Sequence, residues 1–368
     1  MAARRTRRSR LSLSSAPTEV LILGAGFGGL ELATRLSGGD FRVTLIDRSD
    51  GFTFGYSKFD ILFGTKTASE LKLPYAEISK PGVTFRQEEI VSIDPSNRVV
   101  RTDRTSYEPD ILVVALGADY VPFDGGYEFY SIPGAERLRD VLPSITRGIV
   151  QIGVLGVPFK CPPAPFEAAF LLHDYFVSRG VRDEIDLRIA TPMPMPIPVS
   201  PTASAAIIAA LDERKITHEF GHRLAPGSGE GVFIGIPVHR VPAVVQESGL
   251  TEGGTDGWIK VDPTNLRTPY EGVYALGDVA DAPVPRAGTL AENAARAVAD
   301  DIAGRLETPY EGRGVCFIEF GAGEIGMVNV DFLTGPSPSA PLVGPSRDLM
   351  ANKEEFGRIR RQRWFGRS

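Results

Sequence analysis

The strongest constraint on folding is a run of glycines between an apolar segment and a helix-forming one. Residues 20–23 are apolar, glycines follow at Gly24, Gly26 and Gly29, and residues 30–36 favour a helix. Gly24 permits a tight turn, Gly26 leaves no Cβ between the backbone and a pyrophosphate, and Gly29 lets the helix lie close to the strand. The pattern predicts a dinucleotide site at a helix N-terminus, although alone it also fits an ordinary tight turn.

A carboxylate further along the chain favours the dinucleotide interpretation. A second apolar strand is predicted at residues 41–46, and it ends at Asp47, about twenty residues beyond the glycines. A carboxylate at that distance can accept hydrogen bonds from a ribose. An aspartate that ends a strand is otherwise a common turn residue.

The composition indicates a soluble globular protein with two domains. The chain has 368 residues, 42% hydrophobic residues and a formal net charge of −6, so no nucleic-acid partner is implied. Five arginines among the first ten residues predict a disordered basic arm over residues 1–16. A twin-arginine export signal would need an apolar stretch before the folded domain, and the next apolar run is the first strand itself. We therefore expect a cytoplasmic protein.

Two later strands end in small or acidic residues. The buried strand predicted at residues 111–116 ends at Gly117, and the one at 273–276 ends at Gly277 and Asp278. Gly277 allows a close approach, and Asp278 can accept a hydrogen bond from a ribityl hydroxyl. A Gly-Asp pair by itself would be only a turn.

A helix is predicted to follow this strand and to present its N-terminus to the same ligand. We expect it to run from about Thr289 to Leu306. The spacing of Thr289 and Glu292 is that of a capping box, in which each side chain bonds the backbone of the other.

These segments, in this order, resemble the flavoproteins with two dinucleotide-binding folds that are related to glutathione reductase. The resemblance implies an α/β fold with two Rossmann-like, three-layer domains, of which the first binds FAD. It places the FAD domain at residues 17–147 and 255–310, an inserted domain at 148–254, and a C-terminal segment at 311–368. The FAD-binding positions that it implies are Gly24, Gly26, Phe27, Gly29, Asp47, Val91, Gly117, Gly277 and Asp278.

The inserted domain lacks the sequence features of an NAD site. Its first strand, residues 148–154, leads into prolines and a cysteine, where an NAD site needs three spaced glycines. Its second strand, residues 185–190, ends without a carboxylate for the adenosine ribose. NAD binding here is disfavoured.

Cys161 and Cys316 are the only two cysteines, so they are either unrelated buried residues or a redox pair. Cys161 opens the segment C-P-P-A-P-F-E, whose prolines fix the approach to a helix. A helix N-terminus stabilises a thiolate, so we expect a lowered pKa for the Cys161 thiol. A buried inert cysteine is the alternative.

Residues 160–167 resemble the segment that carries one redox cysteine in sulfide:quinone oxidoreductases and in the flavoprotein subunit of flavocytochrome c sulfide dehydrogenase. Residues 312–321, around Cys316, are similar to the segment with the second. The resemblance implies that sulfide attacks a Cys161–Cys316 disulfide, that a persulfide forms, and that electrons pass through FAD to a quinone or a similar acceptor. Glu167 is a candidate proton acceptor, or else a partner of the helix dipole.

The chain departs from that family in two ways. A third cysteine, present in many quinone-reducing members, is missing, and no cysteine near Tyr56 could anchor FAD covalently. We therefore expect noncovalent FAD and leave the acceptor and product open. A type II NADH:quinone reductase and a non-enzymatic flavin-binding scaffold are the alternatives. His173 and His239 are expected to be structural.

The C-terminal residues 353–367 combine arginines with aromatic side chains. Such a segment could lie on anionic lipid as an interfacial helix, which would place the protein on the cytoplasmic face of the membrane as a peripheral protein. The alternative is that it packs on a partner subunit of a homo-oligomer.

Overall fold

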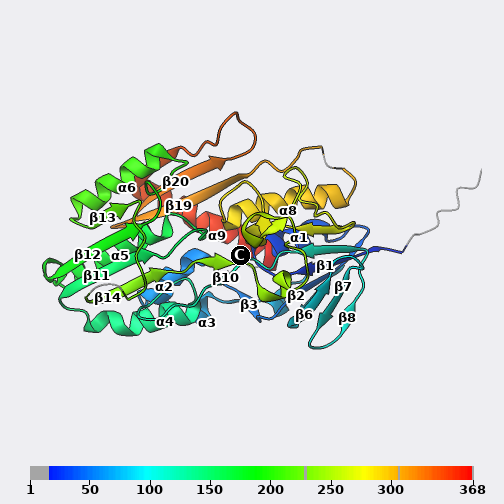
Figure 1. Ribbon diagram of the computed structural model, residues 1–368, viewed down its shortest axis with the longest axis horizontal. Coiled ribbons are helices and arrows are strands. Elements are labelled where there is room, and N and C mark those ends of the chain that lie inside the picture. Colours follow the sequence, from blue (N-terminus) through cyan, green and yellow to red (C-terminus); the bar gives the residue numbers. More distant parts are fainter. Residues whose placement is uncertain (1–15, 228–229, 306, 367–368) are drawn as a thin grey trace, which may run out of the picture.

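The computed structural model describes residues 16–227, 230–305 and 307–366, which form two α/β regions and a C-terminal sheet (Figure 1). The predicted basic arm, residues 1–16, lies almost wholly outside the described residues. The predicted fold class, α/β with two parallel-sheet domains, is confirmed by the two parallel sheets described below.

The first region, on the right in Figure 1, is built on a five-stranded parallel sheet. Its strands, in spatial order, are β17 (Val273–Ala275), β9 (Ile111–Val114), β1 (Thr18–Leu23), β2 (Phe41–Asp47) and β5 (Val83–Gln87). Helices α1 (Phe27–Leu36) and α8 (Gly288–Ile302) pack against each other. Because the strands are parallel, their carboxyl ends meet at one edge of the sheet, where ligands bind in such sheets.

Smaller elements complete this part of the chain, and among them α2 (Lys58–Leu62) packs against α4 (Ile132–Val141) and contributes to the core of the second region. A three-stranded antiparallel sheet consists of β6 (Ile90–Asp94), β7 (Val99–Thr102) and β8 (Ser106–Tyr107). The remaining short elements are β3 (Gly51–Phe52), α3 (Ala68–Leu71), β4 (Leu73–Pro74), α7 (Ala243–Gln246), β16 (Ile259–Lys260) and β18 (Ala280–Asp281).

The second region, on the left in Figure 1, has a four-stranded parallel sheet. Its order is β13 (Thr217–Phe220), β12 (Ile185–Thr191), β11 (Gly148–Val154) and β14 (Val232–Ile236). Its helices are α4 (Ile132–Val141), α5 (Ala164–Ser178) and α6 (Pro201–Glu213), and a two-stranded ribbon of β10 (Asp119–Tyr120) and β15 (His239–Arg240) lies where the chain crosses between the regions.

The C-terminal segment joins both regions. An antiparallel sheet of β19 (Arg313–Gly321), β20 (Glu324–Asp331) and β21 (Leu342–Ser346) packs against α5 through β19, and α9 (Met350–Phe365) follows it. Ile318 and Phe320 belong to the hydrophobic core of the second region, whereas Trp364 and Phe365 belong to the core of the first. The segment therefore ties the two regions together.

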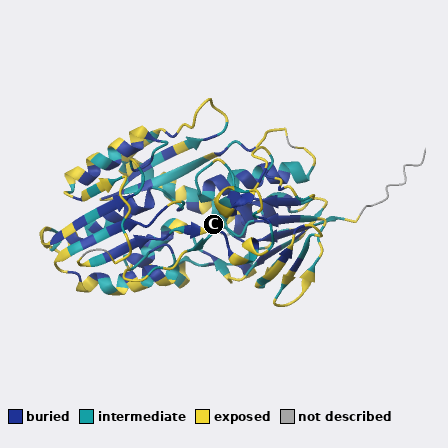
Figure 2. Cartoon of the chain, in the orientation of Figure 1, coloured by how far each residue is buried: buried dark blue, intermediate teal, exposed yellow. Residues whose placement is uncertain are grey.

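The hydrophobic cores divide the chain at places other than those expected from sequence. Figure 2 shows buried residues along the strands of both sheets. Phe129 and Tyr130, which precede the expected start of the inserted domain at residue 148, lie in the second core. Val241 and Val245, inside the expected inserted domain, lie in the first core. Among the described residues, no helix has the length and apolar character needed to cross a membrane.

Candidate active site

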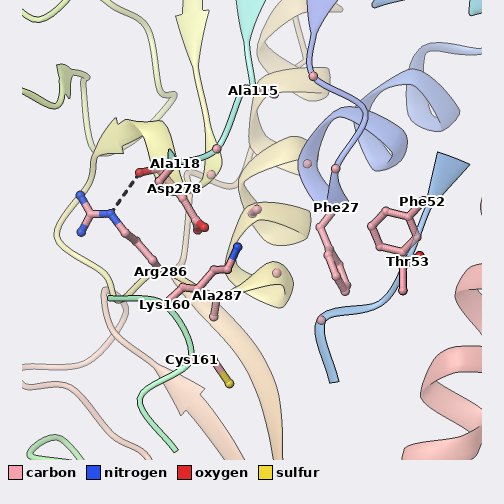
Figure 3. Close-up of a pocket in the computed structure, with 18 of the residues that line it drawn as sticks. Phe27, Phe52, Thr53, Ala115, Ala118, Lys160, Cys161, Asp278, Arg286 and Ala287 are labelled. Carbon is pink, nitrogen blue, oxygen red and sulfur yellow. Dashed lines mark hydrogen bonds between the residues drawn. The ribbon is translucent and has the colours of Figure 1, made fainter. Parts of the chain in front are cut away.

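A cavity of about 760 Å³ opens where the two regions and the C-terminal segment meet, and Figure 3 shows part of its wall. The glycine loop after β1 and the ends of β9 and β17 contribute to it from the first region. The loop before α5 contributes from the second, and β19 and α9 contribute from the C-terminal segment. All three parts of the chain therefore build one site.

The glycine loop behaves as its spacing predicts. Gly24 has φ +98°, and a Cβ there would clash with the carbonyl oxygen of Ala115. A Cβ at Gly29 would clash with the carbonyl oxygen of Gly24, which explains how α1 starts so close to β1. Gly26 is different, because a Cβ there would meet nothing within 4 Å. The space beside Gly26 is open to a ligand, as a pyrophosphate requires.

Asp47 lines the cavity and also braces this loop. Its Oδ2 accepts a hydrogen bond from the amide of Ala25 at 2.8 Å, and its Oδ1 accepts one from the amide of Ser49 at 2.8 Å. The hydroxyl of Tyr75 donates to the carbonyl oxygen of Ala25 at 2.8 Å. The loop is thus held from both sides with the carboxylate of Asp47 at the cavity wall.

The other predicted cofactor positions divide into those that the structure brings together and one that it does not. Phe27, Gly117, Gly277 and Asp278 all line the cavity. Val91 does not: its side chain lies on β6 and is 60% exposed. Residues 88–90, immediately before it, line the cavity instead. The register of the β6–β7 pairing shifts between Ile90 and Ser92, and the Val91 side chain faces solvent there. The contact of Val91 with the cofactor, which the resemblance implies, stays a prediction.

The predicted capping box at Thr289 is wrong. Helix α8 starts at Gly288 with Ala287 as its N-cap, and no side chain caps it. Thr289 lies inside the first turn, so its hydroxyl cannot bond the amide that a cap would reach. Its Oγ1 is buried and has no hydrogen-bond partner among the described residues. Thr289 lines the cavity beside the helix N-terminus, and its hydroxyl oxygen lies close to Gly314 of β19.

These features together fit FAD. One cavity reaches both domains, and along it lie the open space at Gly26, the acceptor Asp47, the acidic Asp278 and Thr289 with its unpartnered hydroxyl. A dinucleotide cofactor needs this succession of phosphate, ribose and ring contacts. The residues along the cavity therefore fit FAD, the cofactor that the fold implies.

Both cysteines line this cavity, although they are far apart in the sequence. Cys161 lies on the loop between β11 and α5, Cys316 lies on β19, and both are free thiols. The charge of Cys316 raises the pKa of Cys161, which indicates that the two sulfurs interact. The pairing predicted from the resemblance thus has both thiols in one site.

Cys161 is held in an unusual backbone conformation. Its φ is +56°, a left-handed value that non-glycine residues rarely adopt. Its amide donates to the carbonyl oxygen of Arg286 at 3.1 Å, and its carbonyl oxygen accepts from the amide of Ala164 at 2.9 Å. The surrounding chain therefore fixes the position of the thiol, and such fixed outliers cluster at functional sites.

The expected lowering of the Cys161 pKa is wrong. Burial raises the pKa of the Cys161 thiol well above its usual range, and burial also raises the pKa of Cys316 to about 11. The negative charge of Glu167 adds to both shifts. A helix N-terminus does stand near Cys161, but loss of water around the sulfur outweighs it.

Glu167 is buried in the first turn of α5, beside the two thiols. Its Oε1 accepts a hydrogen bond from the amide of Glu319 at 3.0 Å, so it joins α5 to β19. Burial raises the pKa of Glu167 to about 7, and the ammonium of Lys353 opposes part of that shift. Glu167 can therefore hold or release a proton near neutral pH, which a carboxylate that only partners a helix dipole would not do.

Three residues of the wall escaped sequence reasoning. Lys58, on α2, donates from Nζ to the carbonyl oxygen of Tyr130, and the hydroxyl of Tyr130 donates to the carbonyl oxygen of Lys160 at 3.0 Å. The Nζ of Lys160 lies 4.8 Å from the centre of the Tyr120 ring. Only the position of Lys160 next to Cys161 could have drawn attention to it; nothing in the sequence connects Lys58 with Tyr130.

The two histidines are structural, as expected. The Nδ1 of His173 accepts from Arg182 at 2.9 Å, away from the cavity. His239 is buried, and its Nδ1 contacts the carbonyl oxygen of Pro237 at 3.0 Å. Burial lowers the pKa of His239 to about 3, so it stays neutral at physiological pH.

Helix α9 packs on its own chain, which neither interpretation of the tail anticipated. The carboxylate of Glu31, on α1, is fully buried and accepts hydrogen bonds from Arg363 at 2.7 Å and from the indole of Trp364 at 2.9 Å. The Trp364 ring lies 5.3 Å from the ring of Phe27 in the cavity wall. Trp364 and Phe365 of the tail are therefore core residues, and Lys353 and Phe356 of α9 line the cavity.

Comparisons with known proteins agree with this architecture. Residues 18–147 match the family described as pyridine nucleotide-disulphide oxidoreductase. The chain is 23% identical over 303 residues to the mitochondrial sulfide:quinone oxidoreductase of Mus musculus, covering 73% of this chain and 67% of that one. It is 34% identical over 110 residues to the type II NADH:quinone oxidoreductase of Staphylococcus saprophyticus, covering 28% of this chain and 27% of that one.

A solved structure shares nearly the whole fold. The sulfide:quinone oxidoreductase of Aquifex aeolicus superposes with a TM-score of 0.82 at 20% identity, covering 95% of this chain and 92% of that one. The resemblance predicted from the cysteine segments and the predicted fold class are both confirmed.

Proposed function

Starting from a two-domain flavoprotein similar to sulfide:quinone oxidoreductases, we propose that the chain oxidises sulfide at Cys161 and Cys316 and passes the electrons through FAD to a quinone-type acceptor. The observation that carries the proposal is the meeting of both cysteines, from β19 and from the loop before α5, in the cavity that the cofactor-binding residues line. A chain that used NADH alone would have no need of two thiols there.

The sulfur chemistry balances with the residues present. Hydrosulfide attacks the Cys161–Cys316 disulfide, so that one cysteine becomes a persulfide and the other leaves as a thiolate, which takes up a proton. A second hydrosulfide removes the outer sulfur as hydrogen disulfide and leaves a thiol. Re-forming the disulfide from the two thiols then releases two electrons and two protons.

Glu167 is the group placed to move these protons. Its carboxyl stands against both thiols, and its pKa of about 7 matches a proton acceptor that works near neutral pH. The raised pKa values of both thiols make such an acceptor necessary, because neither thiol ionises readily by itself. When bound, FAD would supply the two-electron acceptor and the link to the quinone.

The test is anaerobic reduction of the purified yellow protein. Added sulfide should bleach the flavin absorbance, and a soluble quinone should restore it. NADH at the same concentration should leave the flavin oxidised. Bleaching by NADH and not by sulfide would assign the chain to the type II NADH:quinone reductases, which the similarity at the N-terminus alone also allows.

A non-enzymatic flavin scaffold makes a different prediction. Such a protein would bind FAD but would show no reduction by sulfide, and replacing either cysteine by serine would change none of its spectra. Sulfide-dependent bleaching that disappears in both serine variants excludes the scaffold.

A further inference from the structure

Two lysines on the cavity wall are the strongest feature that the proposed reaction leaves unused. Lys58 and Lys160 come from different regions of the chain, both are partly buried, and both line the cavity with Cys161. Lysine side chains removed from water normally pair with a carboxylate. Within the described residues, neither lysine makes an ion pair with a carboxylate within 4.0 Å.

The polar groups around Lys58 compensate only part of its charge. Its Nζ donates to a backbone carbonyl, that of Tyr130. The nearest influential carboxylate is Glu128, whose oxygens already accept from the amides of Tyr130 and Ser131 and from the Ser131 hydroxyl. A lysine ammonium has three donors, so Lys58 retains donors for a further acceptor.

Lys160 faces the same space. Burial opposes its charge, but Tyr120 and Asp278 outweigh burial and raise the pKa of Lys160. Its Nζ stands over the Tyr120 ring at 4.8 Å, and Figure 3 shows the side chain extending into the cavity between Asp278 and Ala287. Burial lowers the pKa of Lys58 to about 7, and the positive charge of Lys160 contributes to that shift. The positive charge of Lys160 therefore acts against that of Lys58 beside the thiol, and an anion bound near Lys58 would relieve this repulsion.

Tyr130 holds the two lysines in a fixed relation. Its carbonyl oxygen accepts from Lys58 and its hydroxyl donates to the carbonyl oxygen of Lys160, so one buried residue bonds both. Lys160 is followed directly by Cys161, whose backbone is itself fixed by Arg286 and Ala164. The ammonium of Lys58 and the backbone of Lys160 are therefore both held near Cys161, and such preorganisation favours binding.

We propose that Lys58 and Lys160 form a subsite for a small monovalent anion beside Cys161, and that hydrosulfide occupies it before it attacks the disulfide. The assignment of hydrosulfide rests on the proposed function, whereas the anion subsite itself does not. The two cations would concentrate the anionic form of sulfide at the reacting sulfur and would hold it there against the low polarity of the cavity wall.

Azide is a suitable probe, because it is a small monovalent anion that does not reduce the flavin. The FAD-loaded protein is titrated with sodium azide, and binding is followed by calorimetry and by the change in the flavin absorbance. Lys58→Met should weaken azide binding about tenfold or more, the loss expected for one charge-assisted hydrogen bond, and Lys160→Met should weaken it as well. Lys58→Arg, which keeps the charge, should retain most of the affinity.

Lys66→Met is the matched control, since Lys66 is an exposed lysine close to Lys58 in sequence and lies outside the cavity wall. It should bind azide like the unchanged protein. Cys161→Ser should bind azide too, because the subsite consists of the lysines. Thermal melting and FAD content show that each variant is folded.

The outcomes separate the two proposals. If Lys58→Met and Lys160→Met bind azide as tightly as the unchanged protein, the subsite is wrong, whatever sulfide does. If both weaken azide binding and also raise the sulfide concentration needed for half-maximal flavin reduction, the subsite and its occupant are supported. If azide binding depends on the lysines but sulfide never reduces the flavin, the anion subsite stands and the assignment of hydrosulfide falls with the proposed function.

Discussion

The two parallel sheets carry the same strand–loop–helix unit, and the two units serve different chemistry. In the first region, β1 passes to α1 through residues 24–26 alone, and the open space at Gly26 faces the cavity. In the second, β11 passes to α5 through residues 155–163, which end in prolines and carry Cys161. One loop leaves room for a phosphate, and the other holds a sulfur.

The amides at the start of the second helix explain why it cannot replace the first. The amide of Ala164 donates to the carbonyl oxygen of Cys161, and those of Phe166 and Glu167 donate to the carbonyl oxygen of Pro163. Pro165 has no N–H group. The donors that would bind a dinucleotide phosphate are therefore already used, which supports the expectation that NAD does not bind there.

The largest expected effect comes from removing the sulfur of Cys161 on the second loop or that of Cys316 on β19. Cys161→Ser and Cys316→Ser should each lower the rate of sulfide-dependent flavin reduction by about a thousandfold or more, as loss of a nucleophile does in other enzymes. Stopped-flow absorbance under anaerobic conditions measures this rate. FAD content should be unchanged, because the cofactor loop belongs to the other unit. A serine variant that keeps a substantial rate would contradict the assignment.

The two helices also differ in their first turns. Helix α5 carries Glu167 there, whereas the first turn of α1 has no acidic residue. Glu167→Gln should slow flavin reduction by sulfide about a hundredfold near pH 8. The carboxyl has a pKa of about 7, so it is an acceptor above that pH and a carboxylic acid below it. The ratio of the unchanged rate to the variant rate should therefore rise from pH 6 to pH 8.

In this ratio the effect of sulfide ionisation on the rate cancels, because it changes the rates of both proteins equally. The other charged or titratable groups coupled to Glu167 are Lys353, Glu319 and the two thiols, and all of them remain in the variant. A ratio independent of pH would show that Glu167 only supports the structure.

Two glycines of the first loop separate cofactor binding from folding. Gly26→Ala should leave the unfolding temperature of the cofactor-free protein unchanged and weaken FAD binding, because its Cβ would enter the ligand space. Gly29→Ala should lower the free energy of unfolding by about 1–3 kcal/mol, since its Cβ would clash with the Gly24 carbonyl oxygen. Fluorescence titration with FAD and thermal unfolding measure the two effects. The opposite assignment of effects would contradict the geometry of the loop.

The smallest expected effect concerns the contact by which α9 supports α1. Trp364→Phe removes the indole donor to the buried Glu31 carboxylate and should lower the free energy of unfolding by about 1–2 kcal/mol. Arg358→Met, on the same helix but at an exposed ion pair, should leave stability unchanged. Chemical denaturation of both variants tests this. Equal stability of the Trp364 variant and the unchanged protein would show that the clamp is not needed.

The features that sequence predicted are local ones. Gly24, Gly26, Asp47, Gly277 and Asp278 follow from short patterns in which strand, turn and helix lie next to each other, and the structure places them at one cavity, whereas Gly29 packs behind it. The meeting of Cys161 and Cys316 came from resemblance, since no local pattern connects two segments on different elements.

What sequence missed depends on burial and on long-range contacts. The Cys161 pKa was predicted from the nearby helix N-terminus, but the tertiary structure decides how much water surrounds the sulfur. The hydrogen bond from Lys58 to Tyr130 joins segments 72 positions apart. The sequence of the tail suggests an interfacial helix or a contact with a partner subunit, yet its buried face packs on Glu31, near the opposite end of the chain.

The redox pairing of Cys161 with Cys316 is the central claim, and peptide mapping of the air-oxidised protein under non-reducing conditions tests it most directly. We expect a cross-linked peptide that contains both cysteines, and we expect it to disappear after anaerobic addition of sulfide, when both thiols become open to alkylation. Complete alkylation of both cysteines in the oxidised protein, with no change on adding sulfide, would contradict it.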